Sequence, residues 1–228
     1  MKPTALQHLA AWTPLIPAVL VAFGDRWRSP PRRWMALWCG VYVALNALAW
    51  ALAARGVNNH WLGYLSYPGE AALAIAALAA CHGAGVERLA LRFTIPLLLG
   101  VTVVVTLILE NPRSFSLIVG PLNSLVVLLA SVWTAVRLGV GAVEPLHRQD
   151  WFWLAGGIML FAAGDVAWGP VAWYLSSQHV DLLHSAINTK AAVDTLAFGA
   201  LTVGILCPTP AIPFGGSSSP GSLRSSSW

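Results

Sequence analysis

Charged residues are scarce in this chain of 228 residues. Asp, Glu, Lys and Arg together make up 10% of the sequence, whereas an average soluble domain has roughly 25%. Hydrophobic residues make up 57%, and the mean hydropathy is +0.68. So few charges cannot cover a water-exposed surface, and the composition therefore excludes an ordinary soluble globular protein.

The sequence also lacks the motifs of common soluble enzymes, since it contains no CxxC, HExxH, GxxxxGK[ST] or GxSxG. The six histidines show no metal-ligand spacing, so neither a metal nor a cofactor is expected. Cys39, Cys81 and Cys207 fall near span ends predicted to be cytoplasmic, where thiols stay reduced, and no disulfide is expected. The net charge of +4 comes from short basic runs between apolar stretches, a pattern that favours a membrane topology over nucleic-acid binding.

Seven apolar stretches are long enough to cross a bilayer. A hydrocarbon core about 30 Å thick needs roughly 20 helical residues at about 1.5 Å each. The stretches run over residues 8–24, 34–54, 60–82, 89–110, 114–137, 151–175 and 182–206. The sequence therefore predicts an all-α polytopic membrane protein, with a bundle of seven transmembrane helices over residues 1–207. Residues 208–228 are rich in Pro, Gly and Ser, which predicts a disordered cytoplasmic tail.

Lys and Arg are distributed unevenly between the two predicted sides of the membrane. One side carries nine arginines: Arg26, Arg28, Arg32, Arg33, Arg88, Arg92, Arg137, Arg148 and Arg224. The other side carries Lys2, Arg55 and Arg113. Because cytoplasmic loops retain positive charge, we expect an outside N-terminus and a cytoplasmic C-terminus in a bacterial plasma (inner) membrane. Tryptophans near the predicted span ends, Trp38 and Trp168 among them, are typical of interfacial belts.

Four ionisable residues fall inside the predicted spans, namely Glu70, Asp165, Lys190 and Asp194. Each costs about 2.5–3.5 kcal/mol at a span centre unless it has a partner or a watery cavity. Counting helical rise from the outer ends of the spans places these four residues and the amides Asn46 and Asn123 at a similar depth. The last span also carries the polar residue Asn188. The sequence therefore predicts one outward-opening binding pocket lined by Asn46, Glu70, Asn123, Asp165, Asn188, Lys190 and Asp194.

Helix-breaking residues accompany three of these positions. Pro68 precedes Glu70, Pro121 precedes Asn123, and a glycine directly precedes Asp165. Kinked spans can offer backbone carbonyls to a cavity, as midplane ion or substrate sites do. The alternative is that the carboxylates only hold the helices together.

Lys190 has two possible arrangements. It can pair with Asp194, which follows four residues later on the same helix face, or its long side chain can extend to the membrane interface.

The segment Gly157-Ile-Met-Leu-Phe-Ala-Ala-Gly-Asp165 resembles a late-helix signature of the lysoplasmalogenase-like membrane hydrolases. That family usually has eight spans and an earlier Asp-containing motif, for which this chain offers only Asn46 and Glu70. The resemblance implies an intramembrane hydrolase of lipid substrates, with Asp165 or Glu70 as general base.

Two further resemblances concern the last spans. Pro170 to Trp173 and the Asp194-Thr-Leu-Ala text resemble the microbial rhodopsins, but Phe198 occupies the position of the retinal lysine and Lys190 precedes the aspartate. The second of these resemblances is similarity in layout to uncharacterised bacterial seven-helix integral membrane proteins. It rests on Glu70, on the WFWLAGG segment with its later GD pair, and on the first residues of the last span. That similarity implies no particular activity.

These observations favour a binding or transport-like membrane protein over an enzyme. Three carboxylates and one amine carry a net charge of −2 when all are ionised, so one carboxyl is expected to hold a proton or share a cation. The expected ligand is a small molecule, a cation or a proton. The alternatives are the lipid hydrolase and, more remotely, a retinal-type photoreceptor.

Overall fold

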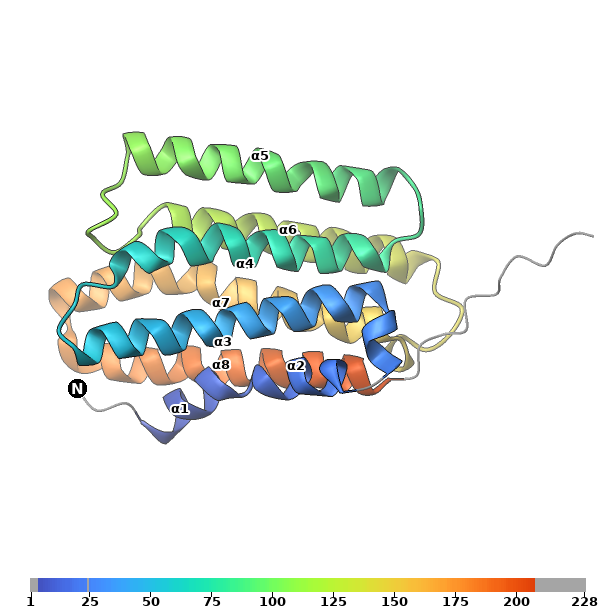
Figure 1. The fold of residues 1–228 in the computed structure, drawn as a ribbon, viewed down its shortest axis with the longest axis horizontal. Coiled ribbons are helices and arrows are strands. Elements are labelled where there is room, and N and C mark those ends of the chain that lie inside the picture. Colours follow the sequence, from blue (N-terminus) through green and yellow to red (C-terminus); the bar gives the residue numbers. More distant parts are fainter. Residues whose placement is uncertain (1–3, 24, 208–228) are drawn as a thin grey trace, which may run out of the picture.

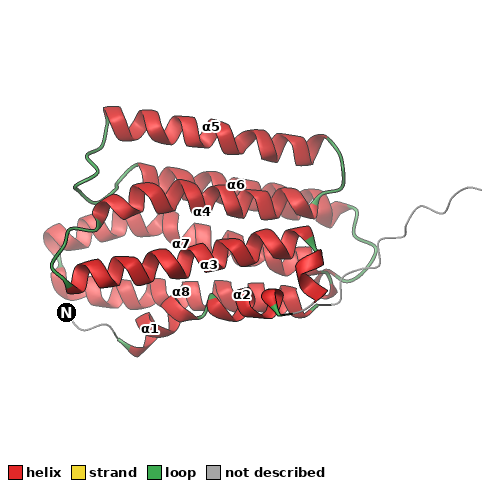
Figure 2. Cartoon of the chain, viewed as in Figure 1, coloured by secondary structure: helices red, strands yellow, loops and turns green. Residues whose placement is uncertain are grey.

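The computed structural model describes residues 4–23 and 25–207, apart from the side chains of 176–178, 180 and 181. These residues form helices and connecting loops without a strand (Figure 2). The α-helices are α1 (Ala5–Trp12), α2 (Leu15–Ala22), α3 (Pro30–Ala54), α4 (His60–Cys81), α5 (Val86–Ile108), α6 (Val119–Val140), α7 (Asp150–Gln178) and α8 (Val180–Leu206). Two 3₁₀ helices, η1 (Asp25–Arg28) and η2 (Leu146–Arg148), lie in the loops.

Seven helical segments are long and apolar enough to cross a membrane, with α1 and α2 together forming the first. The all-α, multi-pass architecture predicted from the sequence is thereby confirmed. The predicted tail at 208–228 lies outside the described residues.

The first span is broken, whereas the sequence predicted one helix over 8–24. Thr4 starts α1 earlier with a capping box, in which its hydroxyl accepts from the Gln7 backbone and the Gln7 side chain accepts from the Thr4 backbone. The helix ends at Trp12 because Pro14 and Pro17 lack the N–H groups that would bond the carbonyls four residues earlier. A short turn therefore separates α1 from α2.

The fifth span begins at Val119, five residues later than the predicted start. The carboxylate of Glu110 accepts hydrogen bonds from the backbone N–H groups of Leu117, Ile118 and Val119, at 2.6, 2.6 and 3.2 Å. A carboxylate at a helix N-terminus satisfies free N–H groups and complements the helix dipole. Pro121 consequently lies in the first turn of α6, where its missing N–H breaks no bond. The kink that the sequence predicted at Pro121 is therefore absent from α6.

Helix α4 lies inside the bundle, in contact with α3, α5, α6 and α7. Helices α7 and α8 form the most extensive pair, and α5 lies at the edge of the bundle (Figure 1). A Cβ atom on Gly157 of α7 would lie 2.8 Å from the Ala197 carbonyl oxygen of α8, so this crossing requires a glycine. Small residues at such crossings are typical of membrane helix packing.

The buried core draws residues from every α-helix from α2 to α8. Trp38 is 1% exposed and stacks edge-to-face on Phe161, with ring centroids 5.2 Å apart. Its predicted interfacial position is therefore wrong, because the indole fills space between three helices instead of reaching the span end. Tyr42 and Phe198 complete this aromatic cluster, and their ring centroids are 5.3 Å apart.

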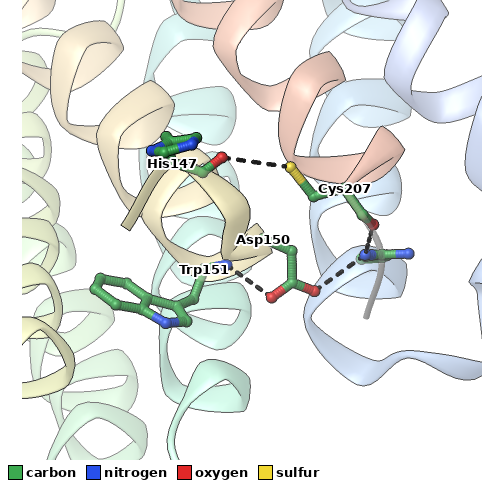
Figure 3. Close-up of polar contacts among 5 residues, drawn as sticks. His147, Asp150, Trp151 and Cys207 are labelled. Atoms are coloured by element: carbon green, nitrogen blue, oxygen red, sulfur yellow. Dashed lines mark hydrogen bonds and ion pairs between the residues drawn. The ribbon is translucent and has the colours of Figure 1, made fainter. Parts of the chain in front are cut away.

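The end of the bundle opposite the N-terminus is fastened by a buried ion pair. Arg32 at the start of α3 lies 3.1 Å from the Asp150 carboxylate at the start of α7. The same guanidinium donates to the Cys207 carbonyl, at 2.7 Å, and so caps the end of α8. Figure 3 shows Asp150, Trp151 and Cys207 at this junction. The contact ties three spans together far from the polar pocket.

Candidate functional site

A cavity of about 340 Å³ lies between α1, α3, α4, α7 and α8. The lining positions repeat every three or four residues along each long helix, as expected when each helix turns one face to a common space. The polar and charged lining residues are Gln7, Asn46, Ser66, Glu70, Asp165, Lys190 and Asp194. Five of the seven predicted pocket residues thus border a single cavity.

Lys190 is held between two carboxylates inside this cavity. Its Nζ lies 2.8 Å from Asp165 Oδ1 on α7 and 2.5 Å from Asp194 Oδ1 one turn further along α8. The three side chains are 14%, 20% and 8% exposed, respectively, so water screens the pairs weakly. The pairing with Asp194 was one of the two predicted arrangements, and the bond across to Asp165 was not foreseen. Lys190 therefore points inward and links α7 to α8.

Glu70 has no such partner. Among the described residues it forms no ion pair, and the indole N–H of Trp38 approaches it without the geometry of a regular hydrogen bond. Glu70 also borders two smaller cavities beside the main one. After Lys190 is shared by two carboxylates, Glu70 is the carboxyl that remains without a cation.

The polar space continues toward the end of the bundle at which α4 begins. A second cavity of about 180 Å³ shares Asn46, Ser66, Tyr67 and Glu70 with the main one. Its other lining residues include Asn59, His60, Phe115 and Ser116, which lie at the start of α4 and before α6. Glu70, near the middle of α4, therefore borders both cavities.

The wall of the cavity is strongly aromatic. Its aromatic lining residues are Tyr42, Trp50, Tyr67, Phe161 and Trp168. The Tyr67 ring fits against two glycines, since Cβ atoms on Gly63 and Gly120 would lie 3.0 and 3.1 Å from it. Lys190 Nζ lies 4.9 Å from the centroid of the Phe161 ring, a cation–π distance.

Two predicted pocket residues have other roles. Asn123 is 1% exposed and donates to Thr102 of α5 and to the Val119 carbonyl, at 3.0 and 2.8 Å. It borders a side cavity of about 20 Å³, together with Glu70 and Asp165, and is not among the lining residues of the main cavity.

Asn188 instead fastens the N-terminal helix. Its Oδ1 accepts hydrogen bonds from the Thr4 hydroxyl at 2.8 Å and from the Gln7 side chain at 3.2 Å. Helix α1 packs mainly against α8, and Gln7, Ala10 and Ala11 border the cavity. Asn188 therefore positions a covering helix and does not line the pocket.

Sequence reasoning missed the aromatic wall, although a signal for it exists. Tyr42 precedes Asn46 by four residues, and Phe161 precedes Asp165 by four. Residues four apart share a helix face, so side chains one turn before each intramembrane polar residue were candidates for the same pocket.

No family model, curated protein or solved structure matches this chain. The resemblances to hydrolases and rhodopsins therefore remain predictions. Phe198, which occupies the position of the rhodopsin lysine, is fully buried in the aromatic cluster. The fold and the cavity define a multi-pass membrane protein with an internal charged pocket.

Proposed function

We propose that this protein binds a cation or a proton at Glu70, as part of a binding or transport-like function in the membrane. The observation that carries the proposal is the charge distribution in the cavity. Lys190 is shared by Asp165 and Asp194, and Glu70 lies in the same space without an ion pair to any residue that the structure describes. An ionised carboxylate in a low-dielectric site needs a compensating positive charge or a proton.

The proposed orientation places the open end of the cavity outside a bacterial plasma membrane. Among the described residues, the opposite end of the bundle carries eight arginines: Arg26, Arg28, Arg32, Arg33, Arg88, Arg92, Arg137 and Arg148. The cavity end carries Arg55 and Arg113. By the positive-inside rule, this asymmetry supports an outside N-terminus and a ligand that enters from outside.

The hydrolase alternative is less consistent with the contacts. Asp165 engages Lys190 with one oxygen and lies 3.5 Å from the Ser124 hydroxyl with the other, so it is poorly placed to accept a proton from water. Glu70 could act as a general base. Binding of a cation or a proton, however, requires only its carboxylate and its position on the cavity, both of which are described above.

Charge movement in reconstituted membranes tests the proposal. Proteoliposomes on a solid support are exposed to jumps in pH, in Na⁺ and in choline concentration. At least one jump is expected to give a transient current that Glu70→Gln abolishes. Glu144→Gln, at an exposed loop carboxylate, serves as the matched control and should leave the current unchanged. A current of equal size in Glu70→Gln would contradict the proposal.

A further inference from the structure

The cavity combines one carboxylate without a cation and a wall of aromatic rings. Electron-rich faces of Trp and Tyr attract organic cations, and such contacts strengthen when water is excluded. Five aromatic side chains border the space that Glu70 enters, and two of them, Trp50 and Trp168, are tryptophans. An aromatic wall beside a carboxylate that forms no ion pair with a described lysine or arginine is suited to a ligand that has an apolar body and a positive head.

The protein already holds one ammonium group in this manner. Lys190 Nζ contacts two carboxylates and lies over the Phe161 ring. Glu70 and its neighbour Tyr67 repeat the combination of carboxylate and aromatic face where they border the second cavity, whose lining residues include no lysine or arginine. A second ammonium, supplied by a ligand, would complete the pattern.

The donor set is unsuited to a bare metal ion. Among the described residues there is no group of three or more His, Cys, Asp or Glu side chains placed to hold one. Hard cations such as Ca²⁺ take about six to eight oxygen ligands. The cavity volume of about 340 Å³ instead lies in the range of small-molecule sites, roughly 300–1,000 Å³.

We propose that the cavity binds a small organic ammonium cation, with its charge against Glu70 and its apolar part against the aromatic wall. This inference rests on the proposed function and specifies the class of its ligand. Gln7, Ala10 and Ala11 of α1 close one side of the cavity, so a bound ligand lies beneath this helix.

Calorimetric titration of the full-length protein in lipid nanodiscs provides the test. The probes are choline, phenethylammonium, NaCl at matched ionic strength, and the uncharged isostere of choline in which a tert-butyl group replaces the trimethylammonium. The isostere keeps the shape of choline and removes its charge. It therefore separates recognition of the cation from simple filling of an apolar space.

Two variants and two controls accompany the titration. Glu70→Gln should weaken binding of the organic cation at least about tenfold, because a close charge pair is lost. Trp168→Leu should weaken it roughly two- to thirtyfold through loss of a cation–π face. Glu144→Gln and Trp133→Leu, at exposed positions away from the cavity, should leave the affinity unchanged. Monodisperse elution of each variant establishes that it is folded.

The expected result is saturable binding of at least one organic ammonium probe, with no comparable binding of the isostere. Equal binding of the isostere and choline would overturn the inference, because the charge would then be irrelevant. A Glu70-dependent response to pH or Na⁺ without binding of either ammonium probe would also overturn it and leave the proposed function standing. The absence of any Glu70-dependent cation or proton response would overturn both.

Discussion

At the scale of single residues, Lys190 determines the charge balance of the pocket. Its ammonium compensates Asp165 on α7 and Asp194 on α8, and all three side chains are largely buried. Removing one member of a buried ion-pair network leaves uncompensated charge, which costs far more than removing the whole network. Removing Lys190 alone therefore measures the cost of two stranded carboxylates, and its net contribution is measured only when its partners are varied with it.

We predict that Lys190→Met destabilises the folded protein by about 3–5 kcal/mol, because two buried carboxylates lose their cation. A triple variant that adds Asp165→Asn and Asp194→Asn should recover most of this loss. The solvent-accessible pair Arg137–Glu87 supplies the control, since water and salt screen this pair and Arg137→Met should cost far less than Lys190→Met. Thermal unfolding in detergent gives the order of stabilities. If Lys190→Met were no worse than Arg137→Met, the pair would not be internal.

Glu110 is a second residue with a large predicted effect. Its carboxylate organises the loop before α6 through three backbone N–H groups and the Ser116 hydroxyl. Glu110→Gln replaces an accepting oxygen by an amide nitrogen, so the predicted cost is about 1–3 kcal/mol. Faster hydrogen exchange of the amides of residues 117–119 should accompany the loss. Exchange equal to that of Glu144→Gln at these amides would contradict the capping role.

Helix α1 is the element most easily separated from the bundle. It is eight residues long, a turn at Thr13 and Pro14 divides it from α2, and Asn188 of α8 holds its first turn. Short isolated helices are marginally stable, so α1 depends on these contacts. Because Gln7, Ala10 and Ala11 line the cavity, the attachment of α1 determines how that side of the cavity is closed.

We predict that Asn188→Leu loosens α1 without unfolding the other spans. Loss of an acceptor for two hydrogen bonds costs roughly 1–2 kcal/mol, which corresponds to about a five- to thirtyfold increase in amide exchange over Ala5–Trp12. Thr189→Val is the matched control, since the Thr189 hydroxyl bonds only within its own helix, to the Ser185 carbonyl. Equal exchange in the two variants would show that Asn188 does not hold α1.

At the scale of the whole molecule, the number of spans follows from the sequence because apolar length decides it. Seven runs of sufficient length give seven spans, whatever the tertiary contacts. Boundaries were less predictable. The start of α6 depends on Glu110, which lies in the loop after α5, and no local sequence pattern predicts that contact.

The site was predictable in part from the cost of placing charge inside a membrane span. Charges inside spans need partners, which identified Glu70, Asp165, Lys190 and Asp194 before any geometry was considered. The depth of Asn188 in the membrane could not show that its side chain lies outside the pocket lining. The direction in which a side chain points depends on how its helix is rotated about its axis. That rotation is fixed by tertiary contacts such as the hydrogen bond from Thr4.

The orientation of the molecule is tested by accessibility labelling. In a background without native cysteines, Ser114→Cys lies in the loop between α5 and α6, and Val143→Cys lies in the loop after α6 at a site 98% exposed. The arginine asymmetry predicts that an impermeant maleimide labels the first variant in intact spheroplasts and the second only after permeabilisation. The reverse pattern would place the cavity mouth in the cytoplasm.

The most direct test of the central claim, that Glu70 shares one cavity with the Lys190 network, is infrared difference spectroscopy of carboxyl bands against pH. The account predicts that Glu70→Gln removes one protonated-carboxyl band and that Asp165→Asn shifts this same band, because the two groups lie in one electrostatic environment. The band of Glu144, on an exposed loop, should not respond to Asp165→Asn. A Glu70 band that is indifferent to Asp165→Asn would contradict the shared cavity and the cation site built on it.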